Sequence, residues 1–120
     1  MKVQNFTELI AWQKAMSLVQ KIYEATKCFP IDERYGLTAQ LRLAGVFVTS
    51  NIAEGQGRNS TAEFRHHLST AHGSVREIET QLWISAHLFY LQKESVSHIL
   101  NLTAEVGRLV KGLSNSLARK

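Results

Sequence analysis

The chain has 120 residues, 44% of them hydrophobic and 20% charged, and its 14 Lys and Arg against 10 Asp and Glu give a net charge of +4. This length and composition predict a single compact domain over residues 1–120 and argue against a disordered chain. One cysteine excludes an internal disulfide and a cysteine-rich zinc site, and because no apolar run approaches about 20 residues we expect a cytoplasmic protein with no membrane partner.

The first predicted helix covers residues 6–28. Asn5 followed by Glu8 resembles a capping box at its start, and Pro30 ends the element because proline has no amide hydrogen to donate. Apolar residues then recur alternately three and four positions apart, which is the spacing of a helix packed in a left-handed bundle. The predicted buried positions are Leu9, Trp12, Met16, Val19, Tyr23 and Thr26.

The second predicted helix covers residues 32–54, with Asp32 as its N-cap and with Gly55 and Gly57 ending it. Its predicted buried positions are Leu37, Leu41, Ala44, Val48 and Asn51. A second group of apolar or small residues lies away from these positions, and a helix that is apolar on two sides is buried on two sides. This second group, Ala39, Leu43, Val46 and Phe47, is the predicted oligomer interface.

The third and fourth predicted helices cover residues 60–91 and 94–117. Ser60 with Glu63 forms a capping box at the start of the third helix. The predicted buried positions are Phe64, Leu68, Ala71, Val75, Ile78, Leu82, Ser85 and Phe89 in the third helix and Val96, Ile99, Thr103, Val106, Val110, Leu113 and Leu117 in the fourth. Four helices with short connections predict an all-α, antiparallel up-and-down four-helix bundle.

The junction between the second and third helices holds an unusual cluster of polar residues and glycines: Asn51, Glu54, Gly55, Gly57 and Arg58. A buried asparagine is costly unless it is hydrogen-bonded, and when satisfied it can fix the register of a bundle. Arg58 is the nearest candidate ion partner of Glu54. We therefore interpret the cluster as a buried polar lock between the two helices and not as a catalytic site.

Glu63 and His66 form one Glu-x-x-His pattern, of the kind that di-iron helical bundles supply twice. A second copy is absent, and with Phe64 facing the core these two side chains point to the flank and outer face, where metal ligands cannot converge. No nucleophile and base stand at a catalytic spacing. We predict no enzyme and no cofactor, with a metal-binding bundle enzyme using Glu63 and His66 as the alternative.

The excess of basic residues lies in the first and last segments of the chain, residues 1–30 and 93–120. Lys14 and Lys21 are one heptad apart on the predicted outer face of the first helix, and Arg108 holds the corresponding position in the fourth. Such a surface can contact phosphates without reading sequence, although a solvated face is the ordinary alternative. The candidate nucleic-acid-binding residues are Lys14, Lys21, Arg108, Lys111, Arg119 and Lys120.

The chain resembles the four-helix-bundle protein family encoded in intervening sequences of bacterial large-subunit (23S) ribosomal RNA genes. The resemblance is strongest in the string Asn51-Ile52-Ala53-Glu54-Gly55-Gln56-Gly57-Arg58 and extends over nearly the whole chain. Further matching stretches are Leu9–Trp12, Phe29-Pro30, Tyr35-Gly36-Leu37, Gln40-Leu41-Arg42, Glu63-Phe64, Gly73-Ser74, Thr80-Gln81-Leu82 and Tyr90-Leu91.

This resemblance implies an antiparallel four-helix bundle that assembles into a ring-like homopentamer. The family is distantly similar to accessory proteins of diversity-generating retroelements, which are basic rings that engage a reverse transcriptase and nucleic acid. We therefore expect a non-enzymatic, homo-oligomeric scaffold that binds RNA or DNA, or a nucleic-acid enzyme, through basic outer faces. A purely protein–protein interaction module is a further alternative.

Overall fold

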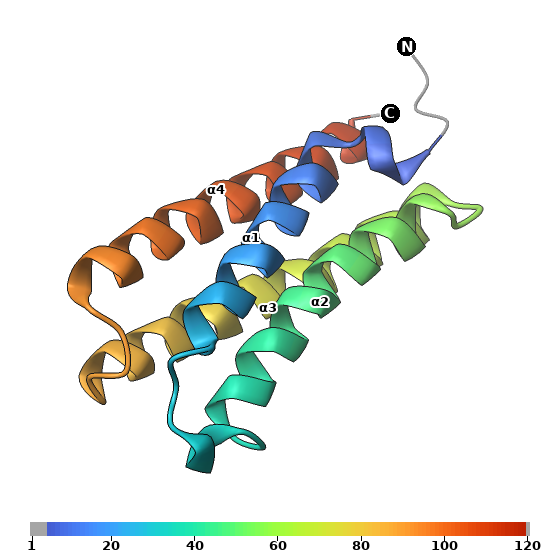
Figure 1. Cartoon of the computed structure of the whole chain (residues 1–120). Coiled ribbons are helices and arrows are strands. Elements are labelled where there is room, and N and C mark those ends of the chain that lie inside the picture. The colour runs from blue at the N-terminus through green and yellow to red at the C-terminus, as the bar shows by residue number, and fades with distance from the viewer. Residues whose placement is uncertain (1–4, 120) are drawn as a thin grey trace.

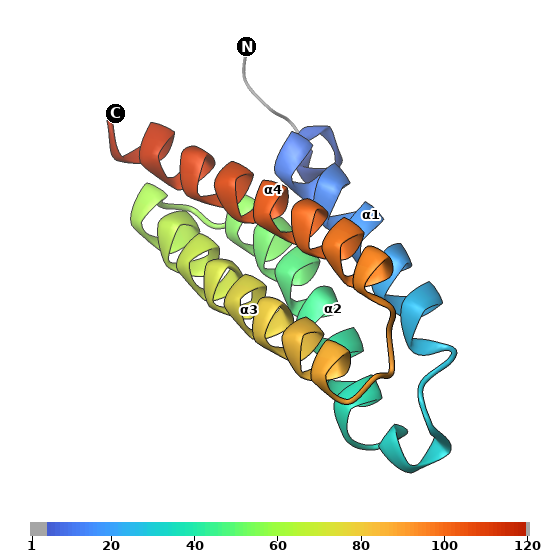
Figure 2. The same cartoon turned by 90° about the vertical axis from the view of Figure 1, so that its left-hand side faces the viewer.

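The structure is a computed structural model that describes residues 5–119 as four long helices packed side by side (Figure 1). The helices are α1 (Ile10–Thr26), α2 (Leu37–Gln56), α3 (Thr61–His87) and α4 (Lys93–Ala118), with short 3₁₀ helices η1 (Phe6–Glu8) and η2 (Ile31–Glu33) before α1 and α2. Successive helices run in opposite directions, and α1 and α3 each pack against both α2 and α4 (Figures 1 and 2). The predicted antiparallel up-and-down bundle is confirmed.

The core is formed by one stripe of each helix. In α3 and α4 the predicted positions are buried or half-buried, with the exception of Phe89, and in α2 the first four predicted positions are buried. The α2 stripe continues through Ile52, while Asn51 lies beside it and is half-buried. Within the described residues, no helix has the length and hydropathy that crossing a membrane requires.

The predicted stripe of α1 is wrong by about one position. Met16 and Tyr23 are exposed, and of the six predicted positions Thr26 alone is fully buried. The residues of α1 that face the core are Ala11, Ala15, Leu18, Ile22 and Thr26. Two alanines let α1 approach its neighbours closely, and the larger amphipathic side chains beside them lie at the rim, where part of each stays in water.

The helix ends differ from the prediction in three places. The Asn5–Glu8 capping box is confirmed, but it caps η1, and α1 begins only at Ile10. Asp32 lies inside η2 and does not cap α2, which begins at Leu37. α3 ends at His87 and not at residue 91.

Glu33 supplies the cap that Asp32 was expected to provide. Its Oε1 accepts a hydrogen bond from the backbone amide of Leu37 at 3.0 Å, and its Oε2 accepts one from the hydroxyl of Tyr90 at 2.8 Å. The Tyr90 ring packs on Phe29, with ring centroids 5.3 Å apart. One carboxylate therefore joins the start of α2 to the loop between α3 and α4.

These bonds shift two pKa values. The amide of Leu37, and then the hydroxyl of Tyr90, stabilise the ionised carboxylate and lower the pKa of Glu33 below its ordinary value near 4.5. The hydrogen bond to Glu33 is the largest cause that raises the pKa of Tyr90, because the phenol proton is held in that bond.

Phe89 was predicted to be buried, but it lies outside the core because α3 ends in a Schellman turn. Its φ of 62° is left-handed, and the amides of Phe89 and Tyr90 donate to the carbonyls of Ala86 and Ser85 at 3.1 and 2.9 Å. The turn directs the Phe89 side chain outward, where it is 92% exposed. A phenylalanine in this conformation is strained, because left-handed backbone is normally left to glycine.

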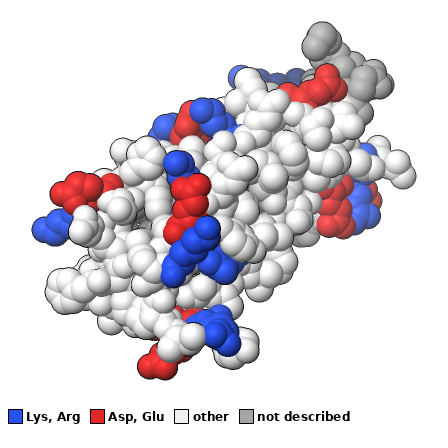
Figure 3. Space-filling view, in the orientation of Figure 1, with Lys and Arg blue, Asp and Glu red and all other residues white. Residues whose placement is uncertain are grey.

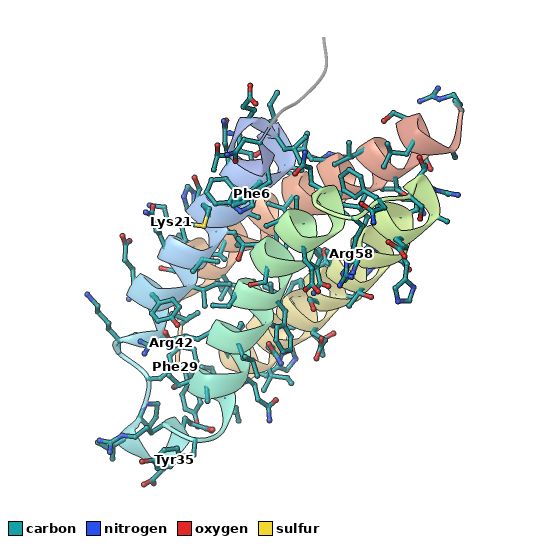
Figure 4. The ribbon with its side chains drawn as sticks, turned by 90° about the vertical axis from the view of Figure 1, so that its right-hand side faces the viewer. Phe6, Lys21, Phe29, Tyr35, Arg42 and Arg58 are labelled. Carbon is teal, nitrogen blue, oxygen red and sulfur yellow. The ribbon has the colours of Figure 1, made fainter. Side chains whose placement is uncertain are left out.

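Arg42 fastens the end of α1 to α2. Its Nε donates to Thr26 Oγ1 at 2.8 Å, and its guanidinium carbon lies 4.5 Å from the centroid of the Tyr23 ring. Figure 4 shows Arg42 near Phe29 where α1 ends, with Tyr35 at the outer tip of the following loop. A cation at the C-terminal end of a helix is favourable to the helix dipole and to the aromatic face.

We predict that Glu33→Gln lowers the melting temperature at neutral pH. The difference in melting temperature between this variant and the unsubstituted protein should become smaller in acid. The lowered pKa of Glu33 means that its charge stabilises the fold above about pH 4.5, and this contribution is lost as the pH falls through the folded-state pKa. Circular dichroism melts across this range measure the difference. Asp32→Asn is the control. A difference in melting temperature that stays constant with pH would show that the charge of Glu33 does not stabilise the fold.

Candidate functional site

The junction between α2 and α3 is a very close approach of two helices. A Cβ atom built on Gly55 would lie 2.7 Å from His67 Cβ and 3.0 Å from Phe64 Cδ1, so any other side chain would force the helices apart. α2 continues through Gly55 to Gln56, and Gly57 follows with a φ of −82°. The expectation that the two glycines end α2 is therefore wrong for Gly55, whose role is to allow contact.

Asn51 joins the same pair of helices through a hydrogen bond. Its Nδ2 donates to the Phe47 carbonyl at 2.9 Å, which leaves Oδ1 as an acceptor 3.0 Å from His67 Nδ1. The His67 ring must therefore donate through Nδ1. This bond is half-buried, and His67 is not among the predicted buried positions of the third helix.

Glu54 is paired with Arg58 as expected, but the pair is not buried. Arg58 Nη2 lies 2.6 Å from Glu54 Oε1, and about half of each side chain is exposed (Figure 4). An exposed ion pair contributes about 0.2–1 kcal/mol. The polar lock between the helices thus consists of Asn51 and His67. Glu54 and Arg58 lie beside it on the surface.

The predicted oligomer interface lies on the outside of α2. Leu43 and Phe47 keep 53% and 47% of their surface exposed, Ala39 is exposed, and Val46 is half-buried. Arg42 does not interrupt this surface, because it is turned toward α1. The outer face of α2, defined as Ala39, Leu43, Val46 and Phe47, is consequently uncharged and in contact with solvent.

Glu63 and His66 lie near the start of α3, and both are exposed. The Glu63 amide donates to Ser60 Oγ at 3.1 Å, which confirms Ser60 as the cap. Within residues 5–119, no group of three or more His, Cys, Asp and Glu residues is close enough to hold a metal ion.

The predicted basic residues do not share one surface. Lys14 Nζ lies 3.7 Å from Glu105 Oε2, and Lys21 is exposed farther along α1 (Figure 4). Arg108 and Lys111 line a different surface, between α4 and α3, and Arg119 is exposed at the end of α4. Lys120 lies outside the described residues. Figure 3 shows basic and acidic side chains interleaved on the face with α1 in front.

A groove runs between α3 and α4, the two helices in front in Figure 2. It consists of two adjoining hollows of about 410 and 440 Å³ that share His72, Lys111 and Asn115. α3 and α4 come close here, because a Cβ on Gly107 would lie 3.3 Å from Val75 Cγ1. The charged and histidine side chains that line the α3/α4 groove are Arg65, His66, His72, Arg76, Glu79, Arg108 and Lys111.

Three groove residues of α3, Arg65, His72 and Arg76, were not predicted as functional. Their spacings of seven and four residues place them on one face of α3, and this pattern is visible in the sequence. What the sequence does not provide is the rotation of α4 that brings Arg108 and Lys111 opposite them. The groove is a property of two helices together.

A sequence model of a family described as 23S rRNA-intervening sequence protein matches residues 7–112. Among solved structures, the chain is similar to the 1.70 Å crystal structure of a protein of unknown function from the S23 ribosomal protein family of Bacteroides thetaiotaomicron. The two chains are 20% identical with a TM-score of 0.81, over 88% of this chain and 96% of the other, so the likeness shows the fold. No curated protein matches the chain.

We predict that Gly55→Ala destabilises the protein by about 1–3 kcal/mol, because the added methyl group must displace α3. Gly57→Ala is the matched control: its backbone is compatible with alanine, and the nearest atom to its Cβ would be 3.6 Å away. This variant should be neutral or stabilised by about 0.4–1 kcal/mol. Urea unfolding of both proteins measures the difference, and equal effects would contradict the close approach at Gly55.

Proposed function

The chain belongs to the 23S rRNA-intervening sequence protein family, and from this membership together with its two outward surfaces we propose that it is a cytoplasmic, non-enzymatic scaffold. In this proposal, five copies form a ring through the outer face of α2. The ring binds nucleic acid, or an enzyme that acts on nucleic acid, through basic surfaces on its outside.

The observation that supports self-association is the exposed apolar surface of α2. The core of the bundle is complete without Leu43 and Phe47, yet about half of each side chain is in contact with solvent. They lie about one turn apart on α2, and no charged residue lies between them in the sequence. Contiguous apolar surface of this kind is typical of protein–protein contact sites, and a second copy of the chain is the partner that our proposal assigns to it.

A ring requires each copy to present two different surfaces, because a surface that contacts only itself closes a dimer. Besides the outer face of α2, a second group of exposed apolar side chains, Trp83, Ile84 and Leu88, lies near the end of α3. Two such surfaces support head-to-tail association. The number five follows from the resemblance to ring-forming relatives.

Binding of nucleic acid is supported by the excess of Lys and Arg and by their position. Arg108 and Lys111 are exposed and have no ion pair within residues 5–119. Phosphate groups are the natural partners of such side chains, and repetition of the same surface around a ring would increase the avidity for a long polyanion.

We predict that light scattering at micromolar concentration gives the mass of five chains of 13.5 kDa each. Leu43→Gln combined with Phe47→Gln should shift the protein to smaller species, because two polar amides replace the apolar contact. Ile10→Gln, at an exposed apolar residue of α1, is the control and should leave the mass unchanged. A strictly monomeric unsubstituted protein would reject the assembly.

We predict that labelled RNA or DNA binds at low salt and is released as the salt concentration rises, because the contacts are to phosphates. Fluorescence anisotropy at two salt concentrations measures this dependence. Absence of binding to both nucleic acids at low salt would reject the nucleic-acid part of the proposal and leave the protein–protein alternative.

A further inference from the structure

The α3/α4 groove contains most of the excess positive charge of the chain. Four basic residues, Arg65, Arg76, Arg108 and Lys111, face one acidic residue, Glu79. Their net charge is +3, compared with +4 for the entire chain. The remaining surface is nearly neutral as a whole, so a polyanion that approaches the bundle is attracted first to this groove.

The basic residues of the groove differ in how strongly they are already engaged. Arg65 Nε donates to Ser114 Oγ at 3.2 Å, and Arg76 Nη1 lies 2.9 Å from Glu79 Oε1. For Arg108 and Lys111 the described residues provide no ion partner. These two exposed side chains therefore have uncompensated charge, while the two on α3 are held in position by their neighbours.

The length of the groove fits a few phosphates. Arg65 and Arg76 are eleven residues apart on α3, which corresponds to about 16 Å along the helix axis. In B-form DNA the phosphates of one strand advance about 3.4 Å per step along the axis while they wind around it, so a groove of this length faces only the few phosphates on the near side of a duplex. The two hollows are continuous, since both are lined by His72, Lys111 and Asn115.

The lining indicates which form of nucleic acid fits. Neither hollow is lined by Phe, Tyr or Trp, the largest stacking platforms for single-stranded bases, and the aromatic rings present are those of His66 and His72. Ser69, Ser114 and Asn115 are present and can bond to phosphate oxygens or to ribose hydroxyl groups. A wide, shallow surface of backbone and 2′-hydroxyl groups is what the minor groove of an RNA duplex displays.

We propose that the α3/α4 groove binds the sugar–phosphate backbone of double-stranded RNA without reading its bases. This inference rests on the proposed function and narrows it to one surface and one kind of nucleic acid. The groove lies between α3 and α4, away from the outer face of α2, and none of the residues that line it belongs to either apolar surface of the proposed ring (Figure 2).

The test compares two double variants that each remove two positive charges. Arg108→Gln with Lys111→Gln alters the groove, and Lys27→Gln with Lys93→Gln alters two exposed lysines that line neither hollow. Anisotropy titrations with a short labelled RNA duplex should show about tenfold weaker binding for the groove variant, with a salt slope smaller by about 2 for each engaged copy. The Lys27 and Lys93 variant should bind almost as the unsubstituted protein does. Light scattering on both variants checks that the assembly is unchanged.

The outcomes separate the two levels of the proposal. If the unsubstituted protein binds no nucleic acid, the nucleic-acid part of the proposed function fails. If it binds and the Lys27 and Lys93 variant loses as much affinity as the groove variant, the groove assignment alone is overturned. Tighter binding to the single strand or to duplex DNA of the same sequence would overturn the choice of duplex RNA. Glu79→Gln removes the one acidic side chain of the groove and frees Arg76, so it should strengthen binding, and weaker binding would contradict the groove.

Discussion

The close contact of α2 with α3 at Gly55 is the constraint on which the outward surfaces of this bundle depend. Without a side chain at this position, the backbone of α2 can lie against His67 and Phe64. The short separation brings Asn51 Oδ1 to within 3.0 Å of His67 Nδ1. Gly55 allows the close contact, and the hydrogen bond of the Asn51 amide fixes which side of α2 faces α3. Together they set the rotation of α2 about its own axis, and that rotation determines which of its apolar residues point away from the core.

The two ends of the bundle are held by different means. At the loop between α1 and α2, the carboxylate of Glu33 bonds to the start of α2 and to Tyr90, and Arg42 bonds to the end of α1. At the opposite end, Asn51 and Gly55 hold α2 against α3. Polar groups near helix ends thus satisfy backbone amides and orient the loops, while the middle of the bundle relies on apolar packing. The middle of α2 is therefore free to present Leu43 and Phe47 to another molecule.

The sequence predicted the number of helices and the buried stripes of α2, α3 and α4, because apolar residues recur there at an unambiguous helical spacing. The stripe of α1 was wrong, since Ala11 and Ala15 are too small to stand out against Trp12 and Met16. The ends of α2 and α3 were also misplaced, because a cap from Glu33 acts across four residues and a phenylalanine replaces glycine in the Schellman turn. The Glu54–Arg58 pair could be predicted, because the two residues are only four positions apart in the chain. The bond from Asn51 to His67 and the α3/α4 groove could not, because both depend on how two helices are rotated against each other.

The two surfaces that we propose are the outer face of α2, for contact with other copies, and the α3/α4 groove, for duplex RNA. Hydroxyl-radical footprinting of the unsubstituted protein, with and without duplex RNA, tests this division directly through the reactivity of Phe47 and His72. We expect Phe47 to be protected at micromolar concentration whether or not RNA is present, and His72 to become protected only when RNA is added. Protection of Phe47 by RNA, or of His72 by concentration alone, would contradict the assignment of the two surfaces.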